Sequence, residues 1–132
     1  MIELLEKLAR LDPKICNRRE DGYSVNCYSA SGELWMSVCL DFDDLQYGLS
    51  PKPLAYIAAA LQQAISDYPD LCYQLKRSDD GVHASIWNAE DKEIPVERVD
   101  EEAAIALLSA YVAWLQWIEV KEWLKPAIDS TG

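Results

Sequence analysis

The sequence predicts a single α+β domain in which an antiparallel sheet packs against three helices. Apolar residues recur at helical spacing in three segments, and apolar and polar residues alternate in two pairs of segments. A short polar turn joins the two members of each alternating pair. The predicted order is helix, two or three strands, helix, two strands, helix, which gives one sheet of four to five strands from two hairpins.

The first half of the chain begins with a helix and continues into a hairpin. The apolar residues from Ile2 to Leu11 fall on one helical face, and Asp12-Pro13 ends this helix. Residues 23–28 and 34–40 then alternate on either side of a turn over 29–32, which predicts a β-hairpin. A short third strand is expected over 45–49.

The second half repeats the alternation of helix and hairpin. Ser50-Pro51 pairs a capping residue with a proline at the first helical position, and the helix that follows stops before Tyr68-Pro69. Residues 71–75 and 82–86 alternate around the turn 78–81 and predict a second hairpin.

The last helix closes the predicted domain. Asp100 is a suitable N-cap, and the helix should run to about Leu124, before Pro126. We therefore expect one domain over residues 1–125 and a flexible tail over 126–132.

The charge and composition exclude several functional classes. Lys and Arg number 12 against 23 Asp and Glu, for a net charge of −11. This sign is wrong for a protein that neutralises nucleic-acid phosphates, and no apolar run is long enough to predict a membrane span. The first residues do not resemble a signal peptide, so a cytoplasmic location is expected. The four cysteines form no C-x-x-C pair and are expected to be free thiols.

The outer face of the predicted sheet is unusually aromatic. If the register is right, this face carries Tyr28, Trp35, Cys39, His83 and Trp87 among small polar residues. Exposed aromatic residues on a polar surface mark partner sites, so Tyr28, Trp35 and Trp87 are candidates for partner binding. In the alternative, the long helix covers this face and the same residues belong to the core.

The last helix is apolar over most of its circumference. One stripe includes Leu108 and Leu115, and the adjacent stripe includes Trp114, Trp117 and Trp123. Such a helix is either central in its domain or shared with another chain. The three tryptophans are therefore further candidates for partner binding, and a homodimer through this helix is expected.

The sequence holds little that predicts catalysis. His83 is the only histidine, no glycine-rich phosphate loop is present, and a Cys-His couple with Cys39 or Cys72 has no motif behind it. Asp41, Asp43 and Asp44 lie close enough together to contact a basic partner, while a metal site there has weak support. We therefore expect no enzymatic activity, no cofactor and no metal.

The element order resembles that of the class I type III secretion chaperones. The resemblance rests on Leu4-Leu5-Glu6-Lys7-Leu8, on residues 33–40, 54–65 and 73–86, and on the helix from Asp100 to Trp117. It implies an acidic homodimer without enzymatic activity that binds an extended segment of a secreted protein. Residues 54–115 also resemble small phage domains in which two helices flank a short antiparallel sheet.

Two functions follow from these observations. The first is a chaperone-like module that binds a partner protein through apolar and aromatic surfaces of helix and sheet. The alternative is a small acidic inhibitor, either a toxin immunity protein or a phage anti-defence protein, whose carboxylates block a basic or nucleic-acid-binding site of its target.

Overall fold

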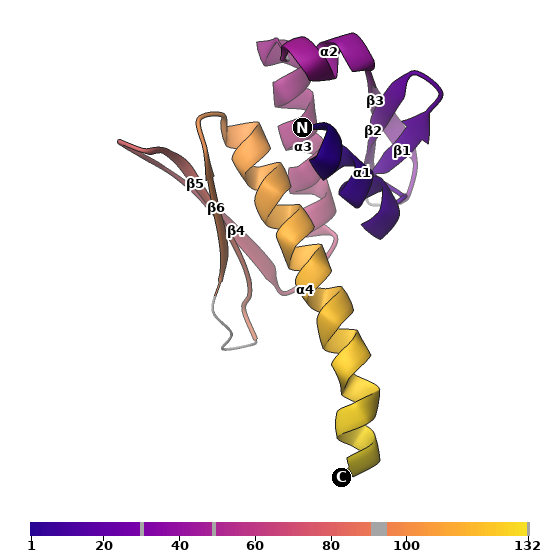
Figure 1. Cartoon of the computed structure of the whole chain (residues 1–132), viewed down its shortest axis with the longest axis vertical. Coiled ribbons are helices and arrows are strands. Elements are labelled where there is room, and N and C mark those ends of the chain that lie inside the picture. Colours follow the sequence, from indigo (N-terminus) through magenta and orange to yellow (C-terminus); the bar gives the residue numbers. More distant parts are fainter. Residues whose placement is uncertain (30, 49, 91–94, 132) are drawn as a thin grey trace.

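The computed structural model describes residues 1–29, 31–48, 50–90 and 95–131, with their side chains through Lys121. The chain is an α+β protein with two three-stranded antiparallel sheets and four helices. Figure 1 shows the two sheets on opposite sides of the long helices α3 and α4. The predicted class is therefore confirmed, but the single sheet is wrong, because the two hairpins form the cores of separate sheets.

The first sheet, β1-β2-β3, consists of β1 (Cys16–Arg19), β2 (Gly22–Tyr28) and β3 (Leu34–Asp41). The predicted hairpin is present as β2 and β3, with Tyr23 opposite Leu40 and Val25 opposite Val38. These side chains are buried on the face that α3 (Pro51–Ser66) and α1 (Ile2–Leu11) cover. The alternation in the sequence thus identifies the inner face correctly.

The second sheet, β4-β5-β6, consists of β4 (Leu71–Ser78), β5 (Gly81–Asn88) and β6 (Val96–Asp100). The predicted second hairpin is present as β4 and β5, joined by the two residues between Ser78 and Gly81. On β5, the side chains of Val82, Ala84 and Ile86 are buried against α4 (Ala103–Thr131), while the residues between them face the other way.

Helix α4 joins the two halves of the molecule. It contacts β5, β6, α3 and α1, and most of its residues from Ala104 to Leu115 are buried. A helix surrounded in this way needs apolar residues on nearly every side. The broad apolar circumference noted in the sequence is therefore used, over this segment, by packing within the chain.

Three elements differ from the sequence-based prediction. The expected strand over 45–49 is wrong where the structure describes it, because α2 (Phe42–Tyr47) is a helix there, and Leu49 lies outside the described residues. The side chain of Asp41 accepts a hydrogen bond from Asp44 N–H at 2.8 Å, and Asp44 accepts one from Asp41 N–H at 3.3 Å. This capping box starts a helix. Strands β1 and β6 were not predicted, because each is short and has exposed charged residues.

The ends of the last helix also differ from expectation. Asp100 ends β6, and its carboxylate accepts a hydrogen bond from Glu102 N–H at 3.0 Å, so the helix begins three residues later, at Ala103. The backbone remains helical through Pro126 to Thr131, where a tail was expected. A proline removes one hydrogen bond from a helix and does not always end it.

Helix α4 is the one helix in the described residues that is long and apolar enough to cross a membrane, over Ala103–Lys121. Half of that stretch is buried inside the protein. Core helices meet the same criterion, so its composition is weak support for a membrane span.

Gly22 provides a test of the first sheet. It faces Asp41 across the β2–β3 ladder, and a Cβ atom at this position would lie 1.9 Å from the carbonyl oxygen of Leu40. Because that oxygen belongs to the backbone, the two strands would have to move apart. We expect Gly22→Ala to lower the free energy of unfolding by about 2–4 kcal/mol in urea titrations. The exposed helical substitution Gln62→Ala is the control, and equal stability of the two variants would contradict this packing.

Candidate functional site

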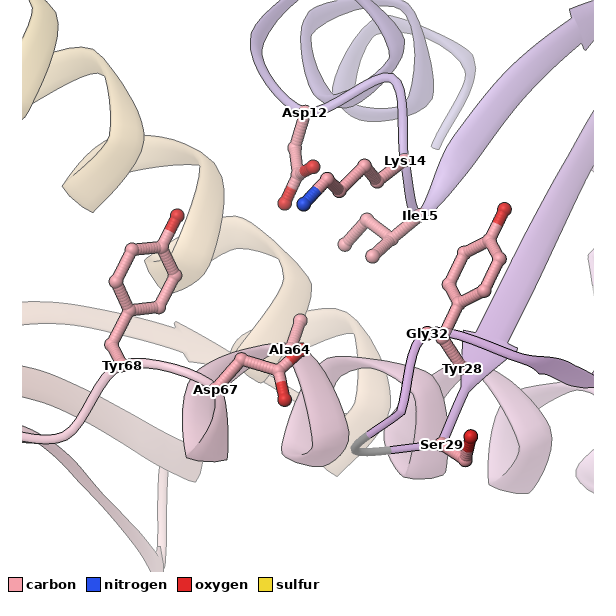
Figure 2. A pocket seen from close by; sticks show the side chains of 9 residues that line it. All are labelled: Asp12, Lys14, Ile15, Tyr28, Ser29, Gly32, Ala64, Asp67 and Tyr68. Carbon is pink, nitrogen blue, oxygen red and sulfur yellow. The ribbon is translucent and has the colours of Figure 1, made fainter.

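A cavity of about 590 Å³ opens where the turn after α1, the end of the β2–β3 hairpin and the end of α3 meet. Figure 2 shows the side chains that surround it. The lining residues are Asp12, Lys14, Ile15, Tyr28, Ser29, Gly32, Ala64, Asp67 and Tyr68. The cavity thus combines two carboxylates, one ammonium and two phenol rings.

Two helices end at this cavity, and an aspartate caps each of them. Asp12 follows α1, and its N–H donates to Leu8 O at 2.7 Å. Asp67 follows α3, and its N–H donates to Gln63 O at 3.2 Å. The last carbonyls of a helix carry a partial negative charge. Two helix ends and two carboxylates therefore give this cavity a negative potential.

The carboxylate of Asp12 is held in place from the core side. The Tyr111 hydroxyl, on α4, donates to Asp12 Oδ2 at 2.9 Å. Burial of the phenol and the neighbouring Asp12 charge raise the pKa of Tyr111 well above its usual value, so its proton stays on the hydroxyl and is donated to the carboxylate. This bond links α4 directly to the wall of the cavity.

Tyr68 is also held by α4. Its ring meets Trp114 edge-on, with ring centroids 5.1 Å apart and an interplanar angle of 76°. Burial is the main cause that raises the pKa of Tyr68, so its hydroxyl is neutral at physiological pH. Its side chain is still 41% exposed, and Figure 2 shows the ring at the rim of the cavity.

Lys14 is the only cationic residue among those that line the cavity. Figure 2 shows its ammonium group directed towards Asp12 from the α1–β1 turn. The side chain is exposed and starts outside the helices, so it is free to swing away from the carboxylates. The chain itself thus places an ammonium group beside the Asp12 carboxylate.

The candidate partner-binding residues lie in different environments. Tyr28 lines the cavity, Trp35 on β3 is 56% exposed, and Trp87 on β5 is half-buried. Trp114 lies in the core at 7% exposure, and Trp117 is 44% exposed. The side chain of Trp123 lies outside the described residues.

The outer faces of both sheets are not covered by the last helix in the part of the chain that the structure describes. Helix α4 packs on the inner face of the second sheet, against Val82, Ala84 and Ile86. The expected outer-face residues are divided between the two sheets, because Trp35 and Cys39 lie on β3, while His83 and Trp87 lie on β5.

The acidic cluster at the end of β3 has a structural use. Asp41 and Asp44 form the capping box of α2, which leaves Asp43 as an exposed acid of its first turn. Among the described residues, no group of three or more His, Cys, Asp or Glu side chains is arranged to hold a metal ion.

His83 lies between two carboxylates on the outer face of the second sheet. Its Nε2 is 2.8 Å from Asp80 Oδ1, and its Nδ1 is 3.0 Å from Glu97 Oε1. Hydrogen bonds to Asp80 first and Glu97 second raise the pKa of His83. Hydrogen bonds from Ser78 and His83 lower the pKa of Asp80 to about 2. Both ring nitrogens contact carboxylates, and this arrangement favours the protonated imidazole.

The four cysteines are unbridged, and two of them are buried thiols. Burial raises the pKa of Cys16 to about 12 and raises that of Cys27, which disfavours their thiolates. Cys39 lies in the first sheet, away from His83 in the second. Cys72 lies opposite Trp87, while His83 lies opposite Lys76. Neither arrangement makes a Cys-His pair in register.

Tyr28, predicted on the outer face of a sheet as a candidate for partner binding, is the one residue of the cavity that was singled out from the sequence, whereas Asp12, Lys14, Asp67 and Tyr68 were missed. The signal that marks two of them is present in the sequence. Asp12-Pro13 and Asp67-Tyr68-Pro69 are both helix ends with an aspartate at the cap. The sequence does not show that these two helix ends, which are more than 50 residues apart, meet at one cavity.

Comparison of the chain with protein-family models, curated proteins and solved structures found no significant match.

The hydrogen bond between Tyr111 and Asp12 is expected to contribute to stability. Tyr111→Phe leaves the ring in place and removes the proton that the Tyr111 hydroxyl donates to Asp12 Oδ2. We expect the free energy of unfolding to fall by about 1–2 kcal/mol in urea titrations, because the acceptor is charged and half-buried. Tyr56→Phe, on the exposed side of α3, is the control. Equal free energies of unfolding for the two variants would show that this hydrogen bond does not stabilise the protein.

The carboxylates around His83 predict a pH dependence. The contacts of His83 with Asp80 and Glu97 raise the pKa of His83 in the folded state. These contacts therefore stabilise the protein fully below pH 6.5, the ordinary pKa of histidine. Their contribution is lost as the pH rises through the folded-state pKa. We expect the stability advantage of the wild type over His83→Gln to be full below about pH 6.5 and to shrink as the pH rises above that value. A constant difference, or an NMR-titrated pKa below 6.5, would be incompatible with these contacts.

Proposed function

We propose that the protein is a non-enzymatic acidic binding module that takes a lysine or arginine side chain of a partner protein into the cavity between α1 and α3. One observation carries this proposal: two helix C-termini, capped by Asp12 and Asp67, meet in one cavity walled by Tyr28 and Tyr68. Each of these groups attracts a cation, and none of them requires a cofactor to do so.

The expected energies suit recognition of one side chain within a larger contact. A cation at a helix C-terminus gains about 0.3–1 kcal/mol, and contact with a tyrosine face adds about 0.5–1 kcal/mol at an exposed site. An exposed ion pair with a carboxylate contributes up to about 1 kcal/mol. A partner's lysine or arginine must also displace Lys14 from the cavity. Most of the affinity would therefore come from the surrounding surface, and the cavity would supply specificity.

The net charge of −11 favours the same kind of partner. A strongly negative protein attracts a basic surface over a distance of about a Debye length and increases the rate of encounter. An inhibitor that occupies a basic or nucleic-acid-binding site of its target has these properties. The charge and the cavity thus favour a small acidic inhibitor over a chaperone-like module.

The chaperone-like interpretation has less support from the packing. It depends on an apolar face of the last helix that is open to a partner, but Leu107, Leu108, Tyr111 and Trp114 are all buried by the protein's own chain. Exposed aromatic side chains are spread over different elements, with Trp35 on β3, Tyr73 on β4 and Trp117 on α4.

The proposal can be tested with the smallest cationic ligand that represents a partner. We expect N-acetyl-arginine amide to shift the amide NMR signals of Asp12, Ala64, Asp67 and Tyr68 and N-acetyl-citrulline amide, its neutral analogue, to shift them little. Asp67→Asn should lower the affinity for the arginine compound by about 2–5-fold, because the substitution removes one carboxylate charge beside a helix end. Raising the salt concentration should weaken it further.

Asp43→Asn is the matched control, because it removes the same charge from an exposed site on α2. The proposal fails if both aspartate variants bind alike, if citrulline binds as well as arginine, or if the shifted signals lie away from the cavity.

A further inference from the structure

Strand β4 is an edge strand with an open side. It pairs with β5 along its whole length, and no strand among the described residues pairs with its other edge. Both of its faces are exposed from Tyr73 to Ser78. An edge strand of eight residues, open on both faces, is a natural site for pairing with another strand.

The inner face of the second sheet changes from buried to exposed at this strand. Ala84 and Ile86 on β5 are fully buried beneath α4. Their cross-strand partners on β4, Leu75 and Tyr73, are each 37% exposed. Helix α4 covers β5 and β6, and α3 reaches only part of β4. An apolar strip thus continues to the edge of the sheet without a cover in the described part of the chain.

The register shows which backbone groups of β4 point outwards. Ala89 N–H donates to Asp70 O at 2.7 Å, so Asp70 is hydrogen-bonded across the hairpin. In an antiparallel ladder, hydrogen-bonded and non-hydrogen-bonded positions alternate. The even-numbered residues of β4 therefore bond to β5, and Leu71, Tyr73, Leu75 and Arg77 direct their N–H and C=O groups to the open edge.

We propose that two copies of this chain pair antiparallel through their β4 strands, with the two-fold axis at Gln74, to form a continuous six-stranded sheet. This register places Tyr73 of each copy opposite Leu75 of the other copy, on the inner face of the sheet. On the outer face it places Lys76 opposite Cys72 of the second copy and diagonal to its Asp70. Aromatic–aliphatic pairs therefore lie at the centre of the inner face, and one pair of opposite charges lies towards each end of the outer face.

A second copy suits this edge better than a foreign strand because the edge is complementary to itself. On the outer face Lys76 stands towards one end of β4, before the turn residues Asp79 and Asp80, and Asp70 stands just before the other end. Antiparallel self-pairing brings these ends together, whereas a parallel arrangement would set like charges side by side. The net charge of −11 on each copy opposes association at low salt, so the dimer should strengthen from low to moderate ionic strength.

The two-fold axis gives a direct chemical test. Gln74 would face its own copy as a non-hydrogen-bonded pair, where the Cβ atoms are close enough for a disulfide bridge. In a full-length Cys39→Ser, Cys72→Ser background, Gln74→Cys should oxidise to a covalent dimer. Ser85→Cys, its cross-strand neighbour on β5, is one strand further from the edge and should remain monomeric. Equal cross-linking of the two variants, or none for Gln74→Cys, would overturn the proposal.

Charge reversal and mass provide the second test. Light scattering should give the wild type a mass near twice 14.9 kDa at about 100 µM protomer and moderate salt. Lys76→Asp should weaken the dimer, because it sets two acids on neighbouring positions of the same face, and Asp70→Lys combined with Lys76→Asp should restore it. A monomeric wild type, or a dimer unaffected by Lys76→Asp, would contradict pairing through β4. The arginine-compound titration is independent of these results, because monomer and dimer both contain the cavity.

Discussion

The packing of helix α4 between the two halves of the molecule is the interaction on which the rest of the structure depends. Its residues from Ala104 to Leu115 contact the second sheet on one side and α1 and α3 on the other. The second sheet is covered mainly by α4, and the first is covered by α3 and α1, which pack on α4 in turn. Removing this helix would expose the inner face of the second sheet and the helices that cover the first, so each half relies on α4 to bury its apolar surface.

The same helix connects the core to the cavity. Tyr111 and Trp114 are one turn apart on α4, and they fix Asp12 and Tyr68, which come from two different helix ends. A weak electrostatic site needs such support, because a carboxylate that moves freely gains little from a bound cation. The cavity is therefore an extension of the core rather than a surface feature added to it.

Much of the fold could be predicted from the sequence, and the failures have physical causes. Alternation identified both hairpins and their inner faces, because the side-chain period of a strand is visible locally. The strand expected near Leu45 is a helix because the Asp41–Asp44 capping box determines the local conformation. The division into two sheets, and the meeting of Asp12 with Asp67, depend on contacts between distant segments. No local pattern records these contacts, so the cavity could not be predicted.

The most direct test of this account is native-state hydrogen exchange of α4. If Ala104–Leu115 forms the shared core, its amides should be the slowest in the protein and should exchange only by global unfolding, with residues of both β2 and β5 exchanging at the same limiting free energy. Exchange of this segment by local opening, at a free energy close to that of the short exposed helix α2, would contradict the central place given to α4.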